Sequence, residues 1–369
     1  MERRIGVEEE FLVVDAAGEV VPAAATIVER AAPVLGNRVG GEITKLQVET
    51  RTDPCHTAAE LHAQLAGGRA TIRDAAATAG LRVLPSGSPV LGQYIPPPIT
   101  EGERQDRGNA MFRGLHDDLA ICAIHVHVEE PDRDRGARIG NHLRAHLPVL
   151  LALTANSPYW AQRDTGFASW RSVTWQRWPV AGPPPYVTSA AQYDANVALL
   201  LDAGALVDRG TVFWDVRLPT HLPTVEVRVS DVPVTAGESA ALAALVHALV
   251  DTAGDAVDAG DPGPLLSPDM LRLAYWRAAR DGMSGHGVDV VTGRLHPAAE
   301  LAERMVATVR PALRKAGNED RVDGWLASLA TGGDGATRQR ASAARRGRLG
   351  DVVDDLTAAL VPARERTIG

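Results

Sequence analysis

The chain has 369 residues, a net charge of −8 and an isoelectric point near 5.8, and 45% of its residues are hydrophobic. This acidic balance argues against a nucleic-acid-binding protein, and the two cysteines, Cys55 and Cys122, are too few for a disulfide framework or a zinc site. The N-terminus has no apolar signal-peptide core, and the apolar stretch 240–250 is too short to span a bilayer, so we expect a cytoplasmic enzyme without a membrane or nucleic-acid partner.

Hydrophobic periodicity and turn signals predict strands and helices that do not alternate strictly. Segments with period-two or β-branched character predict strands at 5–14, 43–50, 82–86, 121–128, 212–218 and 224–229. Apolar residues at helical spacing predict helices at 23–35, 57–80, 138–154, 190–203, 238–250, 267–279, 298–315 and 352–361. Because the segment 214–229 has the pattern of a hairpin, we expect an α+β fold with an antiparallel sheet rather than a doubly wound parallel one.

We expect residues 1–369 to form a single catalytic domain. The segment 157–187 carries a group of tryptophans and then a proline-rich stretch. A connection of this length in a compact domain is usually functional, so we predict an active-site loop there that closes over the site and excludes water. The tail 332–369 starts glycine-rich, becomes arginine-rich and is predicted to be helical.

Three consecutive glutamates, Glu8, Glu9 and Glu10, stand in the first predicted strand. Side chains alternate along a strand, so Glu8 and Glu10 share a face, with their roots about 6.6 Å apart. Two like charges at that range repel by about 2.5 kcal/mol at an effective dielectric of about 20. A bound cation is the simplest compensation, and a charged edge strand with a solvated face is the alternative.

Two later segments add candidate ligands. Glu49 lies at the end of a predicted strand and is a better ligand candidate than Glu42, which could equally be a surface acid. His125 and His127 alternate with valines, so their imidazoles share one strand face and suit a ligand site. Because histidine pairs of this kind also occur in zinc hydrolases, a metal-dependent amide hydrolase is a second interpretation, and a solvated polar face is a third.

The second strand of the predicted hairpin places Thr224, Glu226 and Arg228 on one face. A carboxylate two residues from a guanidinium can be an ordinary ion pair. The functional interpretation puts Glu226 on a cation and Arg228 on a phosphate or carboxylate, which the planar guanidinium binds through two hydrogen bonds. Hard oxygen ligands favour Mg²⁺ or Mn²⁺ over zinc, and Mg²⁺ held by few carboxylates usually also contacts nucleotide phosphates.

These segments together resemble the glutamate–cysteine ligase type 2 family, the bacterial carboxylate–amine ligases, over most of the chain. The segments that carry the resemblance are 6–11, 42–49, 125–127, 156–159, 164–171, 177–184, 214–231, 276–282 and 335–340. The hairpin 214–231 and the segment 164–171 are the specific ones, whereas the last segment alone would be weak.

The resemblance implies a glutamine-synthetase-like fold, in which the concave face of a curved antiparallel sheet holds metal ions, ATP and the acid substrate, with helices packed outside. It implies ATP-dependent joining of an amino-acid carboxylate, typically that of glutamate, to the amine of cysteine or a similar acceptor, and it points to a homodimer. By position, the metal-facing residues that the resemblance implies are Glu8, Glu10, Glu49, His125 and Glu226.

Arg228 and Glu226 are the candidate catalytic residues, and the resemblance implies that Arg228 contacts the transferred phosphate. We hypothesise phosphoryl transfer from ATP to a carboxylate and attack of an amine on the acyl phosphate, a reaction that needs mostly positioning and charge neutralisation. Arg171, Arg217 and Arg277 are weaker candidates for contacts to ATP or to the substrate carboxylate, since arginines beside tryptophans often only stack. A relative that binds nucleotide without catalysis is the remaining alternative.

Overall fold

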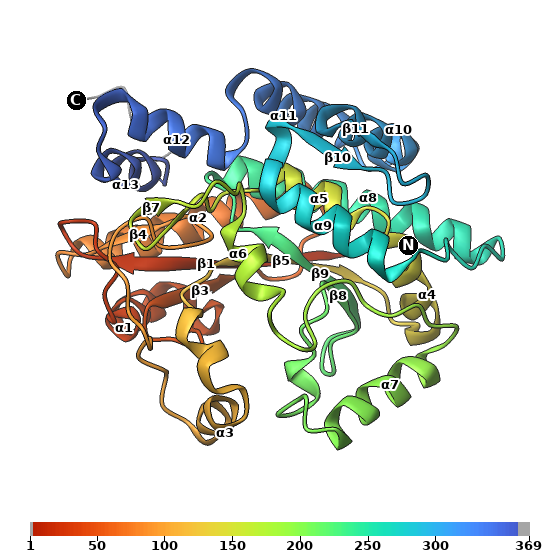
Figure 1. The fold of residues 1–369 in the computed structure, drawn as a ribbon, viewed down its shortest axis with the longest axis horizontal. Helices are drawn as coiled ribbons and strands as arrows, with labels where there is room; N and C mark the ends of the chain where they lie inside the picture. Colours follow the sequence, from red (N-terminus) through yellow and green to blue (C-terminus); the bar gives the residue numbers. More distant parts are fainter. Residues whose placement is uncertain (1–2, 361–369) are drawn as a thin grey trace.

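The computed structural model describes residues 3–360 of the chain (Figure 1). The strands are β1 (Ile5–Val14), β2 (Val39–Gly41), β3 (Gln47–Arg51), β4 (Arg82–Leu84), β5 (Ala123–Glu129), β6 (Tyr159–Trp160), β7 (Arg163–Asp164), β8 (Val216–Arg217), β9 (Thr224–Asp231), β10 (His286–Val288) and β11 (Leu295–Pro297). The α-helices are α1 (Ala24–Leu35), α2 (Ala58–Ala77), α3 (Glu103–Phe112), α4 (Arg133–Leu143), α5 (Leu147–Leu153), α6 (Trp170–Trp175), α7 (Ala190–Asp202), α8 (Ala236–Asp258), α9 (Pro268–Asp281), α10 (Ala298–Lys315), α11 (Glu319–Gly332), α12 (Gly335–Arg346) and α13 (Leu349–Ala358).

A seven-stranded sheet, hereafter the main sheet, organises the molecule. Its strand order is β2-β3-β1-β5-β9-β8, and β4 pairs with the C-terminal end of β1. All of these pairs are antiparallel. The predicted α+β fold with an antiparallel sheet is therefore confirmed. Strands β1, β5 and β9 lie side by side in the middle of the order, which places the acidic strand, the histidine strand and the hairpin strand next to one another.

The helices α2 and α8 cover one face of the main sheet. Ile5 and Val7 of β1 belong to the same hydrophobic cluster as Leu61 and Leu65 of α2, and α8 packs on α2 and on β5. Figure 1 shows α10 and α11 lying outside α8, whereas α3 and α7 lie on the other side of the sheet in this view. The even-numbered side chains of β1 thus point away from α2 and α8, because strand side chains alternate between faces.

Local sequence explains where the two covering helices begin. Thr57 and Glu60 form a capping box at the start of α2, and Thr235 and Glu238 form another at the start of α8. Each box satisfies backbone N–H groups that the first helical turn would leave without partners. By length and composition α8 could cross a membrane, but 78% of its apolar window is buried inside the fold, as in the core helix of a globular protein.

The predicted strands all overlap observed ones, but the predicted helices differ in three places. The helix predicted at 138–154 is two helices, α4 and α5, which separate before Pro148 because proline fits only the first turn of a helix. The segment 157–187 was predicted as a loop, yet it contains the hairpin β6–β7 and the helix α6. The helices α3 and α11 were not predicted. In the tail 332–369, which is predicted to be helical, the structure has α12 and α13, the second of which ends at Ala358, and residues 361–369 lie outside the described residues.

Candidate active site

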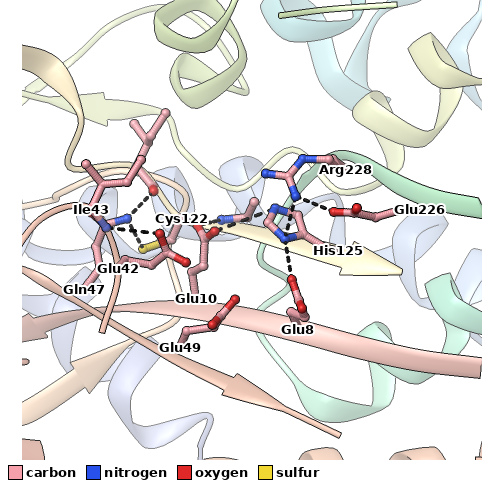
Figure 2. A network of polar contacts seen from close by, with 12 residues as sticks. Glu8, Glu10, Glu42, Ile43, Gln47, Glu49, Cys122, His125, Glu226 and Arg228 are labelled. Atoms are coloured by element: carbon pink, nitrogen blue, oxygen red, sulfur yellow. Dashed lines mark hydrogen bonds and ion pairs between the residues drawn. The ribbon is translucent and has the colours of Figure 1, made fainter. Parts of the chain in front are cut away.

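The face of the main sheet opposite α2 and α8 lines a cavity of about 180 Å³. Strands β1, β3, β5 and β9 form its floor, while α3, α6 and the 3-10 turn Arg209–Thr211 contribute to its walls. The carboxylates in its lining are Glu8, Glu10, Glu42 and Glu49. The basic residues in its lining are Arg104, His125, Arg171, Arg217 and Arg228. An acidic floor therefore faces several guanidinium groups across one small volume. Figure 2 shows the four carboxylates with His125 and Arg228.

The strand register brings the acidic residues together. Glu8 lies opposite His125 in the pairing of β1 with β5, and Glu10 lies opposite Glu49 in the pairing of β1 with β3. His127 lies opposite Glu226 in the pairing of β5 with β9. Residues directly opposite each other in an antiparallel pair share a face and are close enough for their side chains to interact. The convergence predicted from scattered sequence segments thus follows from three antiparallel pairings.

Side-chain distances on this face suit metal ligation. His125 Nδ1 lies 3.1 Å from Glu8 Oε2, and His125 Nε2 lies 3.7 Å from Glu10 Oε1. His127 Nε2 lies 3.7 Å from Glu8 Oε1 and 3.9 Å from Glu226 Oε1. Two groups have ligand atoms that all lie within 4.8 Å of one another, namely Glu8, His127 and Glu226, and Glu8, Glu49 and His125. Glu8 is common to both groups, so a pair of cations could share it.

The acidic end of the cavity has more carboxylates than cationic side chains to pair with them. Burial and the nearby Glu42 raise the pKa of Glu10 to about 8. Burial, together with Glu42 and Glu8, raises the pKa of Glu49 well above its usual range, although Arg51 pairs with it. A divalent cation would supply the missing positive charge. Glu42, which the sequence left undecided between surface and site, lines the cavity with these acids.

Next to the cavity, Glu226 is fully buried between Arg217 and Arg228, the two arginines of β8 and β9 that line it. Arg217 Nε donates to Glu226 Oε2 at 2.6 Å, and Arg228 Nη1 donates to Glu226 Oε1. Burial alone would raise the pKa of Glu226, but Arg228 and Arg217 outweigh burial and hold this pKa below its usual range. Glu226 is therefore an anion over the whole physiological pH range.

Arg228 combines contacts to the site with unused hydrogen-bonding capacity. Its Nη1 lies 3.2 Å from His125 Nδ1, and its buried Nε has no hydrogen-bond partner among the described residues. Burial and the neighbouring Arg228 lower the pKa of His125 to about 4. A neutral imidazole is the form that ligates metals, so Arg228 also favours the ligating state of His125.

The arginines predicted as weaker ATP contacts differ in position. Arg171 and Arg217 line the cavity, but both also hold the protein backbone. Arg171 donates to Val229 O at 3.1 Å and to Arg228 O at 3.0 Å, and Arg217 donates to Gly210 O at 2.9 Å. Their contacts to ATP stay predictions.

Arg277 is not among the residues that line the cavity. It lies on α9, where its Nε is 2.7 Å from Asp281 Oδ2 and donates to His286 O at 3.1 Å. Both of these contacts are made by Nε and lie outside the cavity, so the geometry lends no support to the predicted ATP contact of Arg277.

The cavity also contains residues that the predicted set of site residues does not include, although Trp175 lies in the predicted active-site loop. Arg104 of α3 reaches its wall and forms two hydrogen bonds with Asp208, at 2.7 and 3.2 Å. Trp175 of α6 lines the cavity too, and its buried Nε1 has no hydrogen-bond partner in the described chain. The predicted elements do not include α3, the helix that carries Arg104, so the sequence gives little indication that Arg104 reaches the site. His127 was placed on the correct face but left out of the ligand set.

Asp231, at the end of β9, explains why several separated motifs occur together. Its Oδ2 accepts hydrogen bonds from the Asn156 backbone N–H at 2.9 Å and from Ser157 Oγ at 2.7 Å. Its Oδ1 accepts from Ser169 Oγ at 2.8 Å and lies 3.7 Å from Arg171 Nη1. The segments 156–159 and 164–171 are thereby tied to the hairpin strand that carries Glu226 and Arg228.

Comparisons with known proteins agree with this architecture. Residues 4–355 match the family model described as glutamate-cysteine ligase family 2 (GCS2). A relative in Mycolicibacterium smegmatis, provisionally named glutamate–cysteine ligase 2-3, is 44% identical over 358 residues, which cover 96% of this chain and 98% of the relative. A relative in Rhodococcus jostii, provisionally named glutamate–cysteine ligase 2-1, is 41% identical over 362 residues, covering 97% of this chain and 96% of the relative.

Solved structures share the fold at low sequence identity. The glutamate–cysteine ligase of Francisella tularensis, solved in complex with AMP, has a TM-score of 0.72 at 13% identity, covering 99% of this chain and 91% of its own. A bifunctional glutathione synthetase from Pasteurella multocida has a TM-score of 0.70 at 14% identity, covering 97% of this chain and 52% of its own. The fold is the predicted glutamine-synthetase-like one. The chain belongs to glutamate–cysteine ligase family 2, a family of ATP-dependent carboxylate–amine ligases.

Proposed function

We propose that this ligase activates the carboxylate of glutamate, or of a similar amino acid, as an acyl phosphate and transfers the acyl group to the amine of cysteine or a similar acceptor. One observation carries the proposal. Carboxylates from β1 and β3 line one cavity together with the partly unpaired guanidinium group of Arg228, which also pairs with the carboxylate of Glu226 on β9. A site with anionic and cationic halves suits a metal–nucleotide complex next to an anionic substrate.

The acidic half fits Mg²⁺ or Mn²⁺. The residues that would hold the ions are Glu8, Glu10, Glu49, His125 and Glu226, and His127 joins them on distance. Most of these donors are hard carboxylate oxygens, which divalent cations of this kind prefer. The raised pKa values of Glu10 and Glu49 support this assignment, because a bound cation would favour the charged forms of these buried acids. Bound ions would neutralise the charge of the nucleotide phosphates.

The proposed reaction has two steps. A carboxylate oxygen of the acid substrate attacks the γ-phosphorus of ATP, and ADP leaves. The amine nitrogen of the acceptor then attacks the carbonyl carbon of the acyl phosphate, phosphate leaves, and the nitrogen loses a proton to water. Arg228 would stabilise charge on the phosphoryl group during transfer, as positioned guanidinium groups do in phosphoryl transfer. Glu226 would bind a cation and would also keep the guanidinium group of Arg228 in its orientation.

The helix α6 brings Arg171 and Trp175 to the cavity, which supports an active-site role for the segment 157–187. Residues such as these would help to exclude water, which hydrolyses acyl phosphates. We propose one catalytic domain over 1–369 that acts on small molecules in the cytoplasm as a homodimer.

Product analysis with purified protein, ATP and Mg²⁺ tests the proposal. We expect ADP to be released only when an amino acid and an amine are supplied together, with an amide as the second product. Amide cleavage that needs a metal and no nucleotide would instead support a hydrolase built on His125 and His127. Nucleotide binding without turnover over a broad panel of amines would identify a non-catalytic relative.

A further inference from the structure

Glu9, the middle residue of the three consecutive glutamates, does not face the cavity. Strand alternation points it to the opposite face of β1, where it is completely buried. There it forms two hydrogen bonds with Arg69 of α2, from Nε to Glu9 Oε2 at 3.0 Å and from Nη2 to Glu9 Oε1 at 2.5 Å. Arg69 is only 2% exposed. A complete ion pair is therefore buried directly behind the acidic floor of the cavity.

Arg69 joins three elements that are far apart in the sequence. Its Nη1 donates to Val234 O at 2.8 Å, and its Nη2 donates to Pro233 O at 3.0 Å and to Ser239 Oγ at 3.1 Å. Ser239 Oγ in turn donates to Glu9 Oε1 at 2.6 Å. Residues 233–234 follow β9 directly, and Ser239 lies in the first turns of α8. The guanidinium group thus ties β1 to the end of β9 from behind the sheet.

These contacts of Arg69 lie next to an irregular part of the main sheet. Strand β5 separates β1 from β9, and the pairing of β5 with β9 shifts register between Ile124 and Val126. Such an irregularity interrupts the ladder and bends the strand locally. It falls beside His125. The backbone hydrogen bonds of an irregular ladder constrain the distance between Glu8 on β1 and Glu226 on β9 less tightly than those of a regular one. Both residues nevertheless contribute to the same ligand group.

We infer that Arg69 and Glu9 are positioning residues that set the spacing between the metal-facing carboxylates of β1 and the carboxylate of Glu226 on β9. This inference rests on the proposed metal role of Glu8, Glu10 and Glu226. An apolar pair could fill the same core volume, because a buried ion pair often stabilises a fold no better than well-packed hydrophobic residues. Unlike an apolar contact, a directional network of hydrogen bonds also restrains the relative position of the two strands. The network acts through the ligands and touches no substrate.

The test measures metal binding directly. Mn²⁺ would be titrated into the full-length protein without nucleotide, and its dissociation constant measured by electron paramagnetic resonance of free Mn²⁺. Arg69→Lys keeps the charge but loses the planar fork, and Ser239→Ala removes a single hydroxyl from the network. Val309→Ala is the matched control, since it creates a comparable defect in the buried face of α10, away from the cavity.

We expect Arg69→Lys to weaken Mn²⁺ binding about tenfold, the scale typical for residues that orient metal ligands. Ser239→Ala should weaken binding in the same direction by about threefold, a smaller loss because Arg69 and Glu9 remain paired. Val309→Ala should leave the dissociation constant unchanged even where its melting temperature falls as far. Ser239→Ala decides the matter if Arg69→Lys does not fold.

Wild-type affinity in the folded Arg69 and Ser239 variants would overturn this inference and leave the proposed function standing. An equal loss of affinity in Val309→Ala would also overturn it, because the effect would then follow stability alone. Absence of Mn²⁺ binding by the wild-type protein would remove the proposed metal set itself, and the inference with it.

Discussion

At the scale of single residues, the same side-chain type has opposite environments within one site. Glu10 is buried among other acids, and burial raises its pKa to about 8. Glu226 is buried to a similar extent, but Arg228 and Arg217 hold its pKa below the usual range. The first carboxylate is costly to keep charged without a cation, whereas the second stabilises two buried guanidinium groups. Replacing each by glutamine therefore separates function from stability.

We expect Glu10→Gln to lose turnover almost completely while its melting temperature stays equal or rises. The amide keeps the shape of the side chain but is a poorer metal ligand, and it removes a like charge from the acidic cluster. ADP release and thermal unfolding check the two effects. Glu29→Gln on the exposed side of α1 is the control and should change neither. Normal turnover in Glu10→Gln would refute its assignment as a metal ligand.

Glu226→Gln should also lose turnover, but with a loss of stability of about 3 kcal/mol, because breaking a buried ion pair leaves uncompensated charge. The charges left without a partner are those of Arg217 and Arg228. Urea unfolding measures the stability of the variant against the wild type. A variant as stable as the wild-type protein would contradict the view that Glu226 organises these two arginines.

Arg228→Lys tests the role of the guanidinium group in phosphoryl transfer. Lysine keeps the charge but cannot reproduce the planar fork that contacts Glu226 and the cavity together. We expect kcat to fall about a hundredfold, the scale of losing one preorganised transition-state donor, with a smaller change in KM for ATP. Steady-state kinetics of ADP release provide both values. A change in KM alone would assign Arg228 to nucleotide binding rather than to the chemical step.

At the scale of elements, the helix α12, which precedes α13 near the end of the described chain, is part of the frame around the site. Gln339 Nε2 donates to Asn156 Oδ1 at 2.8 Å, and the Ala336 backbone N–H donates to Ala155 O at 3.0 Å. The Asn156 backbone N–H in turn donates to Asp231 at the end of β9. The packing of α12 is thus connected to the strand that carries Arg228 by buried polar contacts.

Gly335→Ala should disrupt this packing. A Cβ atom at Gly335 would lie 2.2 Å from Asn156 Oδ1 and 2.6 Å from Asn156 Cγ, so the helix or the asparagine must move. We expect a loss of about 2 kcal/mol in unfolding free energy, typical of overpacking, together with reduced turnover. Gly350→Ala in α13 is the matched control, because nothing lies within 4 Å of its added Cβ. It should be neutral or gain up to about 1 kcal/mol from helix propensity.

At the scale of the whole molecule, the fold has an acidic cavity whose negative charge a bound metal–nucleotide complex would neutralise through its cations. A ligand that binds only the folded state stabilises it by mass action. We therefore expect Mg²⁺ with ATP to raise the melting temperature by several degrees, with a rise that grows with ligand concentration. A chelator should abolish the increase. Ca²⁺ serves as a control for ion size, since Mg²⁺ demands tighter octahedral geometry. An identical melting temperature with and without Mg²⁺ and ATP would contradict binding to the folded chain.

Features that depend on neighbouring residues in the sequence could be predicted, whereas features that depend on tertiary packing could not. Strand alternation predicts that Glu8 and Glu10 share one face of β1 and that Thr224, Glu226 and Arg228 share one face of β9, and the strand register agrees with both. Arg277 illustrates the opposite case. Its motif suggested an ATP contact, but only the packing of α9 decides which surface Arg277 reaches, and it reaches Asp281 and His286 O.

The amino-acid order by itself determined the type of most elements and the face on which each side chain lies, because both follow from periodicities of two to four residues. Tertiary structure alone decided that β5 lies between β1 and β9, that His127 meets Glu226, and that Glu9 is engaged by Arg69. These are contacts between residues distant in sequence. They depend on which strands pair and in which register, and no local pattern specifies that choice.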